Sequence, residues 1–311
     1  MTQQIERAGS MPARSRWSGL ASIGLFLLPA LVLYAVFVLI PIVQAAHYSL
    51  YKWNGLTPLS DFIGIANYQR ALADPIFIKA VTHNAIIIVL SLTTQIPFSL
   101  GIALLLNRRF PGRAIFRLLF FAPYVIAEVI AGVVWRLILQ PGGLAEWGLN
   151  GIGLDALYQP WLADTDTVLW ILFVVISWKY FGFHMIILLA GLQGIPRELE
   201  EAAAIDGASR RQAIRYITLP LLGPTIRVSV FLSIIGALQL FDLVWVTTGG
   251  GPADASNTMA TYLVDRGFER SQLGYGSAIS VILFVVALVV AMAYQRFVMR
   301  RDLDGALTGV S

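Results

Sequence analysis

The sequence predicts an all-α fold, a bundle of about six helices that cross a membrane. Hydrophobic residues make up 57% of the 311 residues and charged residues only 13%, whereas soluble proteins average about 25% charged residues. The apolar residues also gather in runs of roughly 20, the length that an α-helix needs to cross the hydrocarbon core of a bilayer. We therefore expect one transmembrane domain, residues 20–301, between an N-terminal segment, residues 1–19, and a flexible C-terminal tail, residues 302–311.

Six apolar runs account for the expected helices. The first, Leu20–Val43, is longer than the roughly 7–15 residues of a signal-peptide core, so we expect it to remain as a membrane anchor. The fifth, Arg227–Val246, contains Gln239 and Asp242 but is otherwise apolar enough to cross. The remaining four runs are Ala85–Leu106, Leu118–Leu139, Val168–Leu192 and Ile279–Gln295.

The lysine and arginine residues indicate how the six helices are oriented. Cytoplasmic segments of membrane proteins are enriched in these residues, and most of the 22 in this chain fall in segments that share a side with the N-terminus. The richest of these segments lie between the second and third runs and between the fourth and fifth. Because the number of spans is even, we expect both termini of this multi-pass protein in the cytoplasm.

Six polar residues stand out within the apolar runs, where an ionisable group costs several kcal/mol unless it meets a partner or a wet cavity. We expect the sixth of them, His184, to be a packing histidine with a partner. The other five are expected to line a path for a solute: Gln95, Glu128, Lys179, Gln239 and Asp242. Glu128 and Lys179 lie near the middle of consecutive runs, so the sequence is equally compatible with an ion pair between them. Aromatic neighbours such as Tyr180 and Trp245 suit the apolar faces of a sugar ring, although packing and interfacial belts also place aromatic residues in this way.

A polar stretch between the fourth and fifth runs is expected to form a pair of short helices. Pro196 suits the first turn of a helix, and the glutamates that follow it complement the positive end of the helix dipole. Gly207 should end this helix, because glycine adopts the left-handed conformation at a helix C-terminus. Ser209 with Gln212 matches a capping box, which starts a second helix that ends at Pro220.

This stretch resembles the EAA motif of the permeases of binding-protein-dependent ABC importers. The residues in register with the motif are Glu201, Ala202, Ala203, Asp206, Gly207, Ala208, Ile217, Leu219 and Pro220. Ile214 departs from the motif, which usually has phenylalanine at this position. Further stretches, residues 178–183, 189–196 and 247–252 among them, look like carbohydrate-uptake permeases of the maltose-permease type.

The resemblance implies a type I importer fold and a role in transport without covalent chemistry. Residues 20–301 would form the permease domain in a bacterial inner membrane, pair with a second, similar permease subunit, and bind a cytoplasmic ABC ATPase dimer. An external solute-binding protein would deliver a sugar or related solute. In this family the helix pair is the coupling element seated on the ATPase. The residues implied to couple are Glu201, Ala202, Ala203, Asp206, Gly207, Ala208, Arg210 and Arg211.

Other classes of function find little support in the residues. The chain has no cysteine, its three histidines are not spaced as metal ligands, and it contains neither a phosphate-binding loop nor the motifs of zinc-dependent or serine hydrolases. We therefore expect no catalytic residue, metal, cofactor or nucleic-acid partner. The alternative is an ion-coupled secondary transporter that uses Glu128 and Asp242 within the membrane.

Overall fold

The computed structural model of the chain describes residues 16–108 and 110–299. The chain forms two compact units, residues 1–47 and 48–311. The described part is helical, and its only extended pairing is an isolated bridge between Tyr51 and Phe62, which confirms the predicted all-α fold. The expected N-terminal segment, residues 1–19, lies mostly outside the described residues, and the expected tail, residues 302–311, lies entirely outside them.

The first unit is an apolar helix made of α1 (Arg16–Tyr34), a π-helical segment η1 (Ala35–Leu39) and α2 (Ile40–Tyr48). Its stretch Leu25–Tyr48 is long and apolar enough to cross a membrane, and none of its most apolar part is buried. The helix predicted for Leu20–Val43 is therefore present, and it continues to Tyr48.

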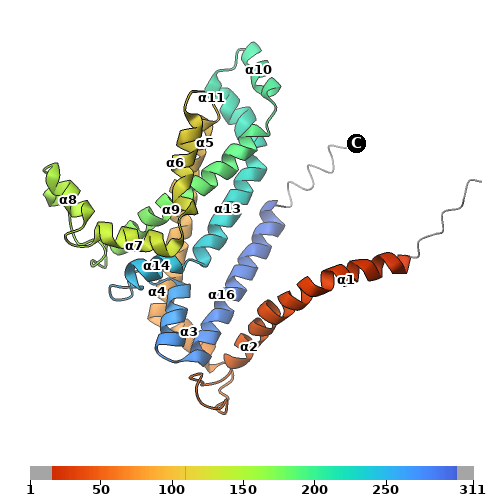
Figure 1. Ribbon diagram of the computed structural model, residues 1–311, viewed down its shortest axis with the longest axis vertical. Helices are drawn as coiled ribbons and strands as arrows, with labels where there is room; N and C mark the ends of the chain where they lie inside the picture. The colour runs from red at the N-terminus through yellow and green to blue at the C-terminus, as the bar shows by residue number, and fades with distance from the viewer. Residues whose placement is uncertain (1–15, 109, 300–311) are drawn as a thin grey trace, which may run out of the picture. The chain divides into compact units, whose positions relative to one another are not determined.

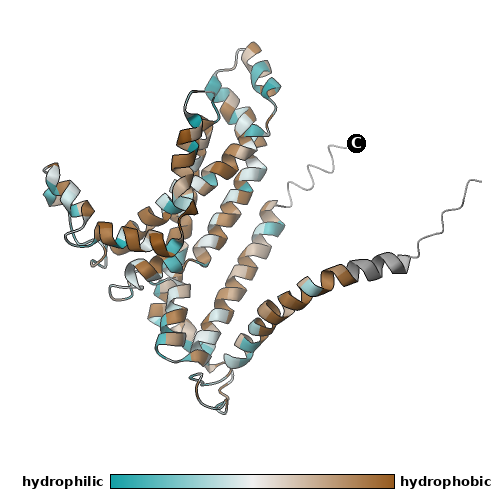
Figure 2. Cartoon of the chain, in the orientation of Figure 1, coloured by the Kyte–Doolittle hydropathy of each residue, from teal (hydrophilic) through white to brown (hydrophobic). Residues whose placement is uncertain are grey.

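In the second unit, three continuous helical stretches are long and apolar enough to cross a membrane: Pro75–Leu106, Val168–Gln193 and Leu273–Met299. They contain three of the predicted runs, and the first begins earlier than the predicted Ala85. Two bent helix pairs are the remaining candidates, so the described residues contain four continuous spans, or six if each bent pair is one span. Figure 2 colours the hydrophobic residues of these helices brown and shows hydrophilic residues in teal at the end that carries α10 and α11.

Figure 1 shows how the elements of the second unit follow one another. The label η marks π-helical segments and, for η3, a 3-10 helix. The elements are α3 (Ala66–Ala73), α4 (Pro75–Leu90), η2 (Ser91–Gln95), α5 (Ile96–Leu106), α6 (Arg113–Val125), α7 (Glu128–Leu139), α8 (Leu144–Gly151), η3 (Asp155–Leu157), α9 (Val168–Gln193), α10 (Arg197–Ile205), α11 (Arg210–Ala213), η4 (Ile214–Thr218), α12 (Leu219–Leu221), α13 (Gly223–Leu238), α14 (Asp242–Thr248), α15 (Met259–Val264), η5 (Asp265–Glu269), α16 (Leu273–Tyr294) and η6 (Gln295–Met299).

Prolines explain three of the π-helical segments. Proline lacks an N–H and its ring clashes with the carbonyl four residues earlier, so it disturbs an α-helix. Pro41, Pro97 and Pro220 each follow a π-helical segment by two residues, and the carbonyl four residues before each proline lies inside that segment. The wider π turn accommodates the proline without ending the helix. Pro220 therefore lies inside a helical stretch that continues to Leu221, whereas the sequence predicted that it ends the helix.

The third predicted span is broken. Instead of one helix over Leu118–Leu139, α6 ends at Val125 and α7 begins at Glu128, with an angle of 97° between the two helices. The two residues of the bend, Ile126 and Ala127, have ψ angles of 136° and 142°. Both residues are apolar, so the hydropathy of the sequence does not detect the bend.

Lys179 of α9 closes the end of α6. A helix leaves its last carbonyl groups without partners, and the interior of a bilayer has no water to supply them. The Lys179 side chain is buried, and its Nζ donates hydrogen bonds to the carbonyl oxygens of Pro123 at 3.1 Å and Tyr124 at 3.0 Å, and to that of Ile126. A cation at this place also complements the negative end of the helix dipole.

The direct ion pair between Glu128 and Lys179, one of the two roles that the sequence left open for them, is not formed, although both residues are described. Glu128 begins α7, where a carboxylate complements the positive end of the helix, and it accepts a hydrogen bond from the hydroxyl of Tyr180. The hydrogen-bond partners of the lysine are instead backbone carbonyl groups. Such partners appear only once the position of the bend is known.

The fifth predicted span is broken as well. Arg227–Val246 is not one helix, because α13 ends at Leu238 and α14 begins at Asp242. Gln239 and Asp242 therefore lie at the break, where both are exposed. A second bend, of 66°, separates α13 from the helical stretch 210–221 that precedes it.

Two side chains from other parts of the chain hold the break after α13. The Nδ2 of Asn84, in α4, donates a hydrogen bond to the carbonyl of Ala237 at 2.6 Å, and its Oδ1 accepts one from the N–H of Met259 at 2.9 Å. The hydroxyl of Thr258 donates to the carbonyl of Leu240 at 2.8 Å. All of these groups are buried, so each hydrogen bond replaces water that cannot reach them.

The second arms of the two broken spans, α7 and α14, pack against each other. At Gly132 of α7, a Cβ atom would lie 3.0 Å from the side chain of Val246 and 3.3 Å from that of Thr247. The absence of a side chain at Gly132 therefore allows the two helices to approach closely. The core around these arms includes Leu172, Val175 and Ile176 of α9 with Leu243 and Val244 of α14.

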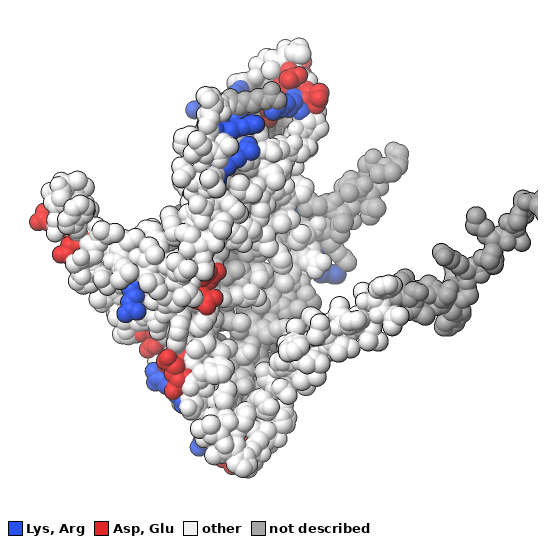
Figure 3. Space-filling view, in the orientation of Figure 1, with Lys and Arg blue, Asp and Glu red and all other residues white. Residues whose placement is uncertain are grey.

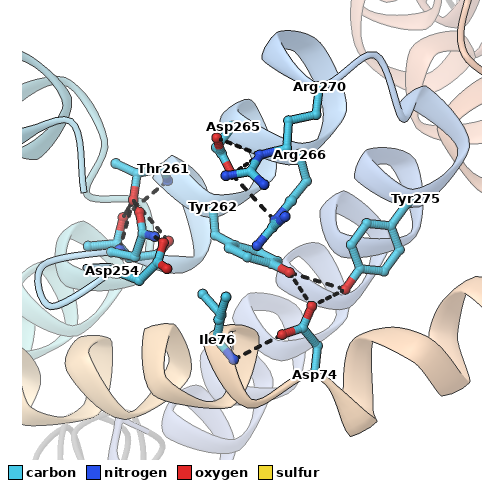
Figure 4. Close-up of polar contacts among 11 residues, drawn as sticks. Asp74, Ile76, Asp254, Thr261, Tyr262, Asp265, Arg266, Arg270 and Tyr275 are labelled. Carbon is cyan, nitrogen blue, oxygen red and sulfur yellow. Dashed lines mark hydrogen bonds and ion pairs between the residues drawn. The ribbon is translucent and has the colours of Figure 1, made fainter. Parts of the chain in front are cut away.

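A polar cluster joins α3, α4, α15 and α16 on the side opposite the α10–α11 end (Figure 4). Asp74 caps α4 by accepting a hydrogen bond from the N–H of Ile76 at 2.9 Å, and it also accepts from the hydroxyls of Tyr262 and Tyr275. Burial raises the pKa of Asp74, but these hydrogen bonds outweigh it and the net pKa lies below its usual value. The carboxylate is therefore held in its charged form.

We expect Lys179→Met to lower stability by about 1.5–3 kcal/mol, because it removes a charged donor and leaves three carbonyl groups of the α6 end unsatisfied. Glu128→Gln should cost less, since Tyr180 retains an acceptor. Thermal unfolding of the purified protein measures both effects, and Lys79→Met, at an exposed lysine of α4, is the matched control. If the loss of stability in the double variant differs strongly from the sum of the two single losses, the result would support a direct interaction between Glu128 and Lys179.

Candidate functional site

The helix pair α10–α11 is the most polar feature between the spanning helices. The chain leaves α9 at Gln193 and enters α10 after Pro196, whose fixed φ suits a helix start. Glu198 and Glu200 occupy the first turn of α10, where their charge complements the helix dipole. On the face shown in Figure 3, basic and acidic side chains gather around this end of the second unit.

A Schellman motif ends α10 and fixes the turn. The N–H of Ala208 donates to the carbonyl of Ala203 at 2.9 Å, and the N–H of Gly207 donates to that of Ala204 at 3.1 Å. Gly207 has φ +83°, in the left-handed region, and a Cβ atom added there would meet no neighbour within 4 Å. The requirement for glycine is therefore conformational and not steric. The turn predicted at Gly207 is present.

The second helix starts as predicted. Ser209 caps α11, and its N–H donates to the Oε1 of Gln212 at 2.7 Å while the N–H of Gln212 donates to the Ser209 hydroxyl at 3.4 Å. The buried hydroxyl of Thr218 donates to Glu200 at 3.0 Å, which ties the second arm back to α10. These short-range contacts make the pair a compact element.

Three large apolar side chains of the helix pair and of the segment η4 that follows it are exposed. They are Leu199, Ile205 and Tyr216, which are 43%, 86% and 70% exposed. Exposed apolar side chains beside charged residues are compatible with a protein docking surface. The residues implied to couple all lie in α10, the turn or the start of α11. Ala203 and Ala208 are partly buried, and the rest are exposed: Glu201, Ala202, Asp206, Gly207, Arg210 and Arg211.

A second candidate site is a mostly apolar pocket of about 170 Å³ between α4, η2, α6, α9 and α13, with a few polar side chains in its lining. Gln95 lines it, is 4% exposed, and has no hydrogen-bond partner for its Nε2 among the described residues. Tyr180 and Tyr124 also line the pocket, and the ring of Tyr124 stacks on Phe183 with centroids 4.6 Å apart. The lining of the pocket therefore combines tyrosine rings with a shielded amide group that lacks a partner among the described residues.

Of the five residues predicted to line a path, only Gln95 faces this pocket. Glu128 reaches it through Tyr180, whereas Lys179 points to the end of α6, and Gln239 and Asp242 lie at the exposed break before α14. The sequence did not single out Tyr124, Ser91 or Ser233 as lining residues. Helical spacing from Gln95 would have pointed to Ser91, four residues earlier on the same face.

His184 also lines the pocket, but its Nδ1 lies 2.8 Å from the hydroxyl of Ser229, as expected for a packing histidine with a partner. Within residues 16–108 and 110–299, no three His, Cys, Asp or Glu side chains are arranged to hold a metal ion.

Comparison with known proteins gives consistent matches. A family model described as the inner membrane component of binding-protein-dependent transport systems matches residues 95–302. A probable ABC transporter permease protein of Pyrococcus horikoshii is 34% identical over 272 residues, 87% of this chain and 93% of that protein. The trehalose/maltose transport system permease protein of Thermococcus litoralis is 34% identical over 273 residues, 88% of this chain and 92% of that protein.

A solved structure is similar over nearly the whole chain. The crystal structure of a bacterial ABC transporter involved in the import of the acidic polysaccharide alginate contains a chain with a TM-score of 0.80 and 25% identity, covering 92% of this chain and 98% of that one. The helix breaks and the α10–α11 pair thus belong to a fold that ABC transporters use. This chain is a member of the family of inner-membrane components of binding-protein-dependent transport systems, the permease subunits of ABC transporters.

Proposed function

We propose that the chain forms part of the membrane pathway for a sugar and receives the motion of ATPase subunits through the α10–α11 pair. The observation that carries this proposal is the rigid turn at Gly207 beside three exposed apolar side chains. A short, well-capped element that shows an apolar surface has the properties of a docking surface. The coupling residues that we assign to it are Glu201, Ala202, Ala203, Asp206, Gly207, Ala208, Arg210 and Arg211.

The chemistry of the solute follows from the pocket and the relatives. The relative of Thermococcus litoralis is named for trehalose and maltose, and one from Streptococcus mutans is named a multiple sugar-binding transport system permease. A volume of about 170 Å³ is below the roughly 300 Å³ at which drug-sized ligands begin to fit. The pocket thus suits one ring of a sugar, with Tyr124 and Tyr180 against its faces and Gln95 at a hydroxyl.

In this proposal, two of the five path residues serve the pocket directly: Gln95 contacts the solute, and Glu128 orients the hydroxyl of Tyr180. The other three lie away from the pocket. Lys179 supports it indirectly by holding the end of α6, and Gln239 and Asp242 lie at the break before α14. Membership of the ABC permease family sets aside the ion-coupled carrier, in which Glu128 and Asp242 would bind the coupling ion.

The partners are those of a complete importer. They are a second, homologous permease subunit, a cytoplasmic ABC ATPase dimer, and an extracytoplasmic solute-binding protein. The solved alginate transporter includes a complex with an alginate pentasaccharide-bound periplasmic protein. ATP hydrolysis belongs to the separate ATPase subunits, and this chain contributes the pathway.

We propose that the helix pair and both termini lie on the cytoplasmic side, as the distribution of lysine and arginine residues indicates. The chain has no cysteine, so single substitutions Ile205→Cys and Leu56→Cys, at side chains that are 86% and 87% exposed, report accessibility without background. A membrane-impermeant maleimide should label Leu56→Cys in intact spheroplasts and label Ile205→Cys only after permeabilisation. The reverse pattern would invert the topology.

The role of Gly207 is tested by Gly207→Val with Gly207→Asn as the matched control. Valine in the left-handed region is strained by about 1–2 kcal/mol or more, whereas asparagine tolerates it. We expect Gly207→Val to lose uptake and ATPase association while remaining in the membrane, and Gly207→Asn to keep most of both. Uptake and co-purification of the ATPase are measured at equal subunit levels. Normal uptake by Gly207→Val would exclude the coupling role.

The role of Gln95 is tested by Gln95→Leu, which keeps the size of the side chain and removes its hydrogen bonds. We expect the maximal uptake rate to fall about tenfold, the equivalent of one hydrogen bond of roughly 1–1.5 kcal/mol, with unchanged ATPase association. Thr93→Ala, at an exposed residue of η2 whose hydroxyl bonds the backbone of α4, is the control. Unchanged uptake by Gln95→Leu would remove Gln95 from the solute path.

A further inference from the structure

A basic cavity of about 670 Å³ lies between the helix pair and the adjoining ends of α5, α6 and α9. Its ionisable lining residues are Arg108, Arg113, Arg117, Arg197, Arg210, Glu200 and Glu201. Five positive and two negative side chains leave the lining with a formal charge of +3. The cavity is used neither by the solute pathway nor by the apolar side chains of the helix pair. Glu201 and Arg210 belong both to the cavity lining and to the proposed coupling residues.

The positive charges of the cavity are not neutralised from within. Among the described residues, the arginines and glutamates of the lining form no ion pair within 4.0 Å. Glu200 instead accepts a hydrogen bond from Thr218. Arg117 donates from Nη2 to the carbonyl of Leu106 at 3.3 Å, and its Nε is shielded from solvent without any partner. A shielded guanidinium N–H without an acceptor is costly, so the cavity lacks an anionic partner.

Phosphate groups have the geometry that arginine clusters recognise, because the guanidinium fork donates two parallel hydrogen bonds to adjacent oxygens. The position of the cavity identifies where the phosphate comes from. The cavity lies at the ends of α5, α6 and α9, in a chain whose helices are long and apolar enough to cross a membrane. Basic pockets between the ends of such helices bind the headgroups of anionic lipids.

We propose that this cavity binds the headgroup of an anionic phospholipid, with Arg113 and Arg117 as its principal ligands. These two arginines are one helical turn apart on one face of α6, and basic clusters at the ends of membrane helices attract anionic lipids. The apolar docking residues Leu199, Ile205 and Tyr216 do not line the cavity, whereas two of the proposed coupling residues, Glu201 and Arg210, do. Only one part of this inference rests on the proposed function, namely that the lipid belongs to the cytoplasmic leaflet.

The test uses the complete transporter, purified with its partner subunits and placed in nanodiscs of phosphatidylcholine with a minor fraction of phosphatidylglycerol. Native mass spectrometry measures the phosphatidylglycerol retained per complex. We expect the wild type to enrich phosphatidylglycerol and Arg113→Gln/Arg117→Gln to lower the enrichment about 25-fold, since each basic residue contributes roughly 1 kcal/mol. Arg296→Gln, at an exposed arginine of η6, should retain the lipid like the wild type.

Further arms separate the alternatives. Arg113→Lys/Arg117→Lys, which keeps the charge, should retain part of the enrichment and serves if the glutamine variant does not assemble. Equal enrichment in the wild type and either double variant overturns the proposal. Displacement of the lipid by excess inorganic phosphate, with equal protection against unfolding, would identify a soluble anion site instead. Loss of the ATPase with unchanged phosphatidylglycerol would assign the arginines to a protein contact. Lipid retention is independent of coupling, so a failure of the Gly207 experiment leaves this test intact.

Discussion

The hydrogen bonds from Lys179 to the end of α6 are the contact on which the membrane part of this structure depends. A bent span exposes backbone carbonyl groups in a medium without water, where each unsatisfied group costs free energy. The chain meets this constraint twice with side chains from other helices: Lys179 serves α6, and Asn84 serves α13. Because both bends are satisfied in this way, α7 and α14 can turn aside and pack on each other at Gly132.

One long helix relates the two candidate sites. α9 has 26 residues, a length of about 39 Å, and its buried face carries Lys179 and His184. Tyr180 on the same helix lines the pocket, and the C-terminal end at Gln193 leads directly into the α10–α11 pair. In the proposed function, this continuous helix is the route by which a displacement of the pair reaches the residues around the pocket. The Thr218–Glu200 hydrogen bond joins the second arm of the pair to α10.

The predictions from the sequence were most accurate for features that depend on contacts between residues close together in the chain. The left-handed turn at Gly207 and the capping box of Ser209 depend on residues within a few positions, and both are present. The bends within Leu118–Leu139 and Arg227–Val246 were missed, because apolar composition reports that a segment is lipid-compatible but not its direction. The polarity of Gln239 and Asp242 did mark the second bend, although it was interpreted as a solute path. Lys179 was identified as a cation within a span, but its carbonyl partners were not, since a sequence displays charges and not free carbonyl groups.

The sequence positions of Asn84 and Lys179, which bond the carbonyl groups at the two bends, determine when each bend can be satisfied during synthesis. Asn84 precedes its acceptor Ala237 by 153 positions, so it is already in place when the ribosome completes α13. Lys179 follows its acceptor Pro123 by 56 positions. During synthesis, the carbonyl groups at the end of α6 therefore lack their Lys179 partner until much of α9 has been made. The hydrogen bonds of the third span are complete only when the fourth span is present.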